Sequence, residues 1–136
     1  MNDDAAWARL AAGRVGRFAT SAPRIVPVTF AVVGSAIVHA VDHKPKATRA
    51  LARVEDIRRD PRASLLVDHY DEDWSRLWWI RIRGRAEVHR EHDEVAVAVV
   101  AALATKYTQY RERPPADAVY RIAIDDIRSW RPPDNA

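Results

Sequence analysis

Hydrophobic and polar residues alternate most regularly between Leu77 and His89. One face carries Ile80, Ile82, Gly84, Ala86 and Val88, and the other carries Arg81, Arg83, Arg85 and Glu87. A period of two is typical of a β-strand with one buried face. Because Gly84 has no side chain, its place in mid-strand predicts a bulge, a bend or a close approach by another part of the chain.

The same pattern, with turn signals at 21–23 and at Gly34-Ser35, predicts six strands. They span residues 15–20, 24–33, 36–42, 63–70, 77–89 and 119–124, and 127–130 extends the last strand after a bulge. Helical spacing of apolar residues predicts three helices over 3–12, 47–59 and 91–107. Strands at hairpin spacing, without regular alternation with helices, indicate a mainly β (α+β) fold. We expect a largely antiparallel barrel with flanking helices, and not a doubly wound sheet.

Length and composition indicate how many domains the chain forms and in which cellular compartment we expect it. The chain has 136 residues, 48% hydrophobic and 30% charged, which suits a single domain over 1–136. It has no cysteine, which excludes disulfides, thiolate zinc sites and a cysteine nucleophile. The longest apolar run, Val95–Ala104, is too short for a membrane span, and no signal peptide is visible. We therefore expect a cytoplasmic protein without a membrane partner.

The net charge is +3, and nearly all the positive charge is arginine. Such a bias can come from the base composition of the coding sequence, so the rare lysines are more informative. Lys44 and Lys46 lie where a predicted strand gives way to the predicted helix 47–59. A helix start has unpaired N–H groups and the positive end of the helix dipole. The two lysines there predict a site for a phosphate or a carboxylate.

Several other kinds of chemistry are disfavoured. The chain has no G-x-G-x-x-G, P-loop, G-x-S-x-G or H-E-x-x-H motif. A metal site from His39, Asp42 and His43 fits no recognised ligand spacing. The acidic residues within 68–73 are more typical of a solvated hairpin than of paired catalytic carboxylates. The arginines within 81–85 are more typical of a solvated strand than of a nucleic-acid surface. We expect neither a metal nor a nucleic-acid partner.

Six stretches carry a family resemblance: GRFAT (16–20), VPVTF (26–30), VDHKPK (41–46), DPRASLLVDHYDEDW (60–74), LWWIRIRGRAEV (77–88) and IRSW (127–130). In this order they resemble the split β-barrel flavin and deazaflavin proteins, the pyridoxamine 5′-phosphate oxidase-like superfamily. Within it, the chain is similar to the coenzyme F420-dependent oxidoreductases. The resemblance implies a six-stranded Greek-key split barrel that forms a homodimer, with two cofactor sites at the interface.

The resemblance also implies the reaction and the cofactor contacts. Reduced F420 would give hydride to a small conjugated acceptor, and the ring of the cofactor, rather than a catalytic side chain, would do the chemistry. The alternatives are an FMN-dependent enzyme of the pyridoxamine-phosphate-oxidase type, or a non-enzymatic protein that binds F420, FMN or haem. Arg49, Arg53 and Arg59 would extend the positive surface toward the anionic tail of F420. The implied cofactor contacts are Pro27, Val28, Thr29, Val41, Asp42, Lys44, Lys46, Thr48, Arg49, Trp78 and Trp79.

Overall fold

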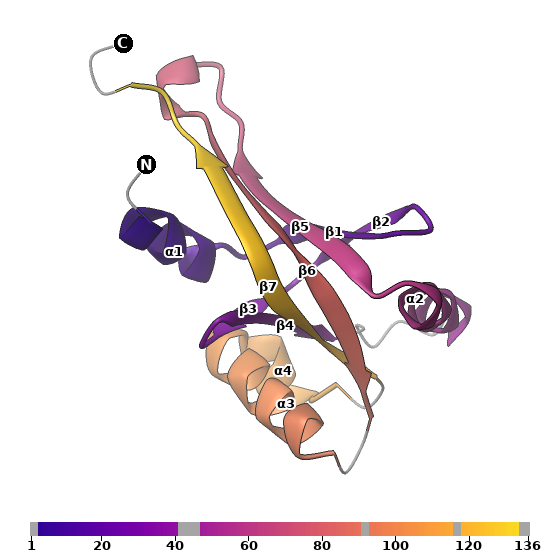
Figure 1. Ribbon diagram of the computed structural model, residues 1–136. Coiled ribbons are helices and arrows are strands. Elements are labelled where there is room, and N and C mark those ends of the chain that lie inside the picture. Colours follow the sequence, from indigo (N-terminus) through magenta and orange to yellow (C-terminus); the bar gives the residue numbers. More distant parts are fainter. Residues whose placement is uncertain (1–2, 41–46, 91–92, 116–117, 134–136) are drawn as a thin grey trace.

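The computed structural model describes residues 3–40, 47–90, 93–115 and 118–133 (Figure 1). Within these ranges, seven strands and five helical segments follow one another. In order they are α1 (Asp3–Ala12), β1 (Gly16–Thr20), β2 (Arg24–Val28), β3 (Ala31–Val33), β4 (Ala36–Ala40), α2 (Ala47–Arg59), β5 (Arg62–His69), the 3-10 turn η1 (Trp74–Arg76), β6 (Trp78–His89), α3 (Glu94–Lys106), α4 (Thr108–Glu112) and β7 (Val119–Trp130).

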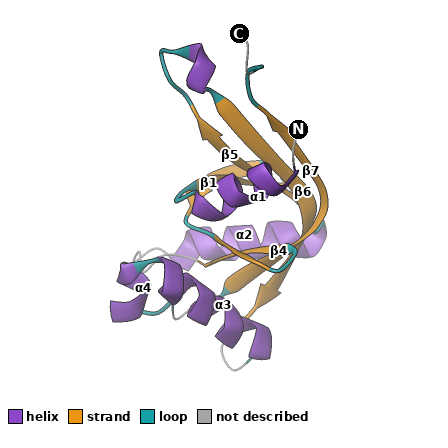
Figure 2. Cartoon of the chain, turned by 90° about the vertical axis from the view of Figure 1, so that its left-hand side faces the viewer, coloured by secondary structure: helices purple, strands orange, loops and turns teal. Residues whose placement is uncertain are grey.

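The strands form one antiparallel sheet in the order β2-β1-β5-β6-β7-β4-β3. The sheet curls strongly, and helices flank it (Figures 1 and 2). β6 and β7, each 12 residues long, run side by side through its centre. The expectation of an antiparallel, mainly β fold with flanking helices is confirmed.

The prediction of six strands is wrong, because the predicted strand 24–33 divides at Thr29 and Phe30. Its first part pairs with β1, whereas its second part pairs with β4 at the opposite edge of the sheet. Side chains replace the strand partners at the break. Phe30 N donates to Tyr107 Oη at 3.0 Å, and Lys106 Nζ donates to Phe30 O at 2.9 Å. A buried peptide that is satisfied in this way needs no sheet partner.

Gly84 is at a bulge, as its place in the sequence predicted. The register of β6 with β7 shifts between Arg83, which pairs with Asp126, and Gly84, which pairs with Ile124. A Cβ atom on Gly84 would lie 2.0 Å from the carbonyl oxygen of Ala123. Glycine is therefore required there by a close backbone approach. The continuation of the last strand to Trp130 is also confirmed.

The predicted helix 91–107 is shorter and is followed by a second helix. α3 begins after Asp93, whose carboxylate accepts from Val95 N at 2.7 Å and lies 2.9 Å from His89 Nδ1. Apolar residues on one side of α3 pack on β4 and β7, while Val97 on another side is 64% exposed. None of the helices within the described ranges is long and apolar enough to cross a membrane.

The barrel interior is filled by aromatic and aliphatic side chains, and it also encloses His39. The His39 ring is fully buried, 4.5 Å from the Phe18 ring and 4.7 Å from the Tyr120 ring, between centroids. Neither ring nitrogen of His39 has a hydrogen-bond partner in the described part of the chain. Burial, and then the charge of Arg53, lower the pKa of His39 from 6.5 to about 3. His39 is therefore a neutral core residue at neutral pH.

This burial predicts a loss of stability in acid. The folded protein resists protonation of His39 until the pH nears 3, whereas the unfolded chain takes up the proton near 6.5. The free energy of unfolding should thus fall as the pH drops below 6.5, by about 2 kcal/mol between pH 7 and pH 5 from this residue. In His39→Phe, urea denaturation at the two pH values should lack this part of the fall. Exposed His69 provides the control, because His69→Gln should keep it. An unchanged slope in His39→Phe would contradict the assignment.

Candidate functional site

The outer face of the sheet is defined by strand register. On β6, Trp79, Arg81 and Arg83 alternate with the buried residues Ile80 and Ile82. Residues paired across neighbouring strands share a face. Across β2, β1, β5 and β6, the outer row that contains Arg81 is Pro27, Arg17, Leu66 and Arg81. This face of the sheet therefore combines apolar and arginine side chains, and we call it the outer face.

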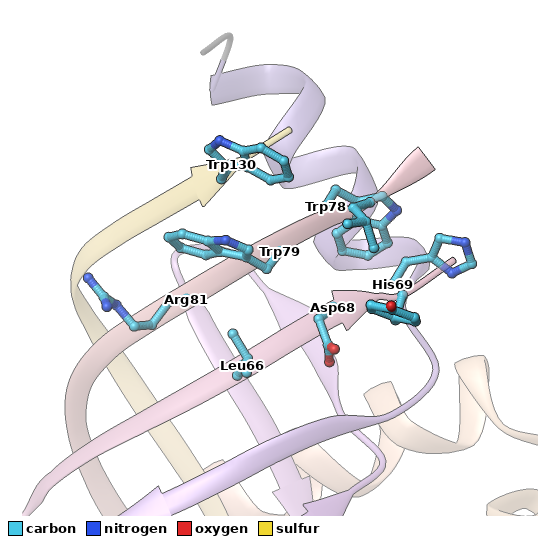
Figure 3. Close-up of a pocket in the computed structure, with 9 residues that line it drawn as sticks. Leu66, Asp68, His69, Trp78, Trp79, Arg81 and Trp130 are labelled. Atoms are coloured by element: carbon cyan, nitrogen blue, oxygen red, sulfur yellow. The ribbon is translucent and has the colours of Figure 1, made fainter. Parts of the chain in front are cut away.

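A cavity of about 670 Å³ lies where the outer face meets the β5–β6 hairpin. Aromatic residues supply much of its wall. Figure 3 shows Trp79 and Arg81 on β6 beside Leu66 and Asp68 on β5, with Trp130 at the end of β7. We call this the aromatic cavity, and its lining is Leu66, Asp68, His69, Tyr70, Leu77, Trp78, Trp79, Arg81 and Trp130.

The charges around the aromatic cavity are unequally compensated. Asp68 forms an ion pair with Arg17 on β1 at 2.5 Å, so its charge is balanced. The guanidinium carbon of Arg81 lies 5.8 Å from the centroid of the Trp79 ring. Arg81 Nε is buried and has no hydrogen-bond partner among the residues that the structure describes. The cavity thus has apolar walls and one positive charge without a carboxylate partner.

A second hollow, of about 600 Å³, lies further along the outer face and is more polar. Its arginines are partly balanced, because Arg62 pairs with Asp60 at 2.6 Å and Arg128 lies 3.7 Å from Asp126. The hydrogen bonds from Arg62 lower the pKa of Asp60 to about 2. The lining is Ala19, Thr20, Ser21, Arg62, Ala63, Ser64, Arg83, Gly84, Asp125, Asp126 and Arg128. These ion pairs make the second hollow a weaker candidate for binding an apolar ring.

The residues expected along the cofactor strand have different environments. Pro27 is exposed on the outer face, in the same row as Arg81 and three strands away from it, or roughly 14 Å. The side chain of Val28 is 6% exposed and packs in the core. Thr29 Oγ1 lies 2.7 Å from Tyr110 Oη. Of the three, Pro27 offers a free side-chain surface on the outer face.

The cofactor contacts expected between residues 41 and 49, which include those to the phosphate, lie outside the part of the chain whose side chains the structure describes. Val41, Asp42, Lys44 and Lys46 lie outside the described residues, as do the side chains of Thr48 and Arg49 at the start of α2. The last described residue before them is Ala40 at the end of β4, which pairs with Val119, and Val119 in turn pairs with His89. That point is at the end of β6 opposite to Trp79, about 30 Å away along the strand.

The two adjacent tryptophans lie on opposite faces of β6. Trp78 packs against the core, with the Arg9 guanidinium carbon 5.4 Å from its ring centroid. Trp79 points to the outer face, where it pairs with Trp130 of β7. Both border the aromatic cavity. Alternation along the predicted strand could have separated their roles, and the same alternation along β7 could have identified Trp130.

Two arginines of α2 that were expected to extend a positive surface make contacts within the protein instead. Arg53 is 8% exposed, and its guanidinium carbon lies 5.6 Å from the Tyr120 ring centroid. Arg59 is exposed and pairs with Glu55 at 3.3 Å. The idea that Arg53 extends a positive surface toward a cofactor tail is therefore wrong, since its side chain is packed into the barrel.

The third lysine of the chain, which the sequence did not single out, has a structural role. Lys106 Nζ donates to the carbonyl oxygens of Gly13 and Phe30. Burial, and then the charge of Arg14, lower the pKa of Lys106 to about 8. The position of Lys106 in a predicted helix does not predict that it would bind the carbonyl oxygens of Gly13 and Phe30.

In the loop between β5 and β6, acidic side chains accept hydrogen bonds from nearby backbone N–H groups. Asp71 accepts from Asp73 N at 2.8 Å, and Asp73 accepts from Ser75 N at 3.1 Å. The second bond caps the 3-10 turn η1. The hydrogen bonds from Ser75 lower the pKa of Asp73. Within the described ranges, no group of three or more acidic, histidine or cysteine side chains could hold a metal ion.

Comparisons with known proteins agree with the architecture. Residues 3–131 match the protein family described as Pyridoxamine 5′-phosphate oxidase. A conserved hypothetical protein from Mycobacterium tuberculosis is 24% identical, with a TM-score of 0.75 over 96% of this chain and 85% of that one. An FAD-binding protein from Mesorhizobium loti is 20% identical, with a TM-score of 0.65 over 95% and 92%. A heme-binding protein from Mycobacterium smegmatis is 24% identical, with a TM-score of 0.65 over 89% and 50%. A search of curated protein sequences gave no match.

Proposed function

Because the chain belongs to the pyridoxamine 5′-phosphate oxidase family, we propose that it is an oxidoreductase that binds a flavin-type tricyclic cofactor and reduces a small conjugated acceptor. The observation that carries the proposal is the aromatic cavity on the outer face, which is lined by Trp79 and Trp130. Planar apolar walls suit a flat, conjugated molecule such as the acceptor that a tricyclic cofactor would reduce. In such a reaction the cofactor ring supplies the chemistry, and the protein binds and orients it.

The residues around the cavity fit such a cofactor and its acceptor. When bound, a flavin or deazaflavin supplies the hydride chemistry. Pro27 on β2 and Trp79 on β6 share the outer face, so both can border the space above the sheet. Trp79 and Trp130 would exclude water and orient planar molecules, and Lys44 and Lys46 would bind the anionic tail.

The form of the cofactor is a separate part of the proposal. The family resemblance favours F420, with FMN as the alternative, while related structures include FAD-binding and heme-binding proteins. The burial of Arg53 removes one argument for the long anionic tail of F420. Titration of cofactor-free protein with F420, FMN and FAD in turn, followed by absorbance, decides among them. Failure of all three to bind would contradict the proposed function.

The tail site can be tested with a double variant. Lys44→Ala with Lys46→Ala should weaken binding of the preferred cofactor by about 1.5–3 kcal/mol for each charge-assisted contact that is lost. Calorimetric titration of the folded variant measures this loss. Arg58→Ala, which removes an exposed charge from the other end of α2, should bind as the wild type does. Unchanged affinity in the double variant would move the tail site elsewhere.

We also propose a homodimer. Ala40, which precedes the expected tail contacts in the sequence, and Trp79 lie toward opposite ends of β6, and a second copy could bring the two ends together. Val97 on the poorly charged helix α3 is exposed and suits an interface. Light scattering at tens of micromolar should give the mass of two chains. Val97→Asp should shift the mass toward one chain, whereas Gln109→Asp on exposed α4 should not. A monomeric wild type would contradict the dimer.

Trp79 should matter more for turnover than for cofactor affinity. Its ring shapes the aromatic cavity, which is distant from the expected tail site. With reduced cofactor and a quinone as acceptor, Trp79→Ala should lower kcat/KM by at least about tenfold, because the reacting rings are less well oriented. Trp74→Ala is the control, since Trp74 is 69% exposed and does not line the cavity. Wild-type kinetics in Trp79→Ala would assign this residue to packing.

A further inference from the structure

The aromatic cavity contains an unusual charged group. Arg81 is half-buried on a strand of 12 residues, between the rows that contain Trp79 and Arg83. Its Nε is buried without a hydrogen-bond partner in the part of the chain that the structure describes. A buried donor that stays unpaired costs free energy, which an added acceptor would recover.

Neighbouring carboxylates do not neutralise Arg81. Asp68, the carboxylate that lines the same cavity, is paired with Arg17. Asp126 lies 3.7 Å from Arg128 and borders the other hollow. Across the described residues, no ion pair involves Arg81. The charge of Arg81 is therefore available to a ligand in the cavity.

The surroundings of this charge restrict the shape of the ligand. Trp79 of β6 is paired with Trp130 of β7. Leu66 of β5 lies beside Arg81 of β6 (Figure 3). Aromatic walls favour a flat, conjugated molecule. The planar guanidinium favours a carboxylate, which it can bind through two parallel hydrogen bonds.

We propose that the aromatic cavity binds the acceptor of the reaction and that this acceptor is a planar conjugated carboxylate. The conjugated part lies against Trp79 and Trp130, and the carboxylate binds Arg81. That the ligand is the acceptor of the reaction rests on the proposed function. That the ligand is a planar conjugated carboxylate rests on the cavity alone. Arg81 is thus a specificity residue that distinguishes anionic from neutral flat molecules.

The test compares two flat probes of the same shape, 2-naphthoate and its neutral amide, 2-naphthamide. Calorimetric titration of the protein should give a dissociation constant about 10- to 100-fold lower for the carboxylate. Cyclohexanecarboxylate, which has the charge but no flat ring, should bind more weakly than 2-naphthoate. Equal affinity of 2-naphthoate and 2-naphthamide, or equal affinity of the two carboxylates, would overturn the proposal.

Two variants assign the effect to Arg81. In Arg81→Gln, the preference for 2-naphthoate over 2-naphthamide should be lost while the melting temperature and the affinity for 2-naphthamide are kept. Arg83→Gln, which removes the next outward arginine of the same strand but not a wall of this cavity, should keep the preference. Retention of the preference in Arg81→Gln, or its loss in Arg83→Gln, would overturn the assignment.

Competition separates the inference from the proposed function. Saturating FMN, FAD or F420 should leave 2-naphthoate binding in place, because the acceptor and cofactor occupy different spaces. Displacement of the probe would show that the cavity holds the cofactor ring itself and would overturn the acceptor assignment. If no tricyclic cofactor binds but the Arg81-dependent preference persists, the proposed function fails while the ligand class stands.

Discussion

The course of the sheet depends on how the Thr29–Phe30 segment is bound by the α3–α4 junction. Tyr107 Oη accepts from Phe30 N at 3.0 Å and lies 2.7 Å from Phe30 O, to which Lys106 also donates. Tyr110 Oη lies 2.7 Å from Thr29 Oγ1. Buried backbone groups must find partners, and here side chains supply them. The chain can therefore leave the β2 edge and continue as β3 at the other edge, which closes the curl and leaves Pro27 on the outer face.

The local pattern of hydrophobic and polar residues predicted much of this fold, because these residues alternate along a strand that buries one face. The alternation in β6, the bulge at Gly84 and the continuation of β7 all follow from side-chain size and polarity along a short stretch. The break at Thr29–Phe30 could not be predicted in this way. The backbone of Phe30 is hydrogen-bonded to Tyr107, 77 positions away in the sequence. The apolar run 24–33 contains no signal that predicts this hydrogen bond. Long-range side-chain bonds overrode the local preference for one strand.

Sequence reasoning proposed some residues of the candidate site and did not propose others. Trp79 was identified from the sequence, but Arg81 was interpreted as one of several solvated arginines. The interpretation failed because solvent access depends on neighbouring strands: Trp79 and Leu66 partly cover Arg81, whereas Arg83 stays exposed. The solvent exposure of Arg53 was overestimated in the same way. This residue lies off the apolar stripe of α2, yet it is buried because its guanidinium packs over the Tyr120 ring.

The outer face carries the two hollows described above, so we expect a ligand to bind there. The barrel interior is filled by Phe18, His39 and Tyr120: the His39 ring stacks on the Tyr120 ring, and the Phe18 ring is tilted against both, so a flat molecule cannot enter it. α3 packs on β3, β4 and β7. The hollows described above lie over β1, β5, β6 and β7. A guanidinium with an unpaired buried donor is costly in a folded core but tolerable at the wall of an open cavity, where solvent reaches the rest of the group. That cost is recovered when an oxyanion binds, so the same strand alternation that stabilises the sheet also makes its outer face selective for charge.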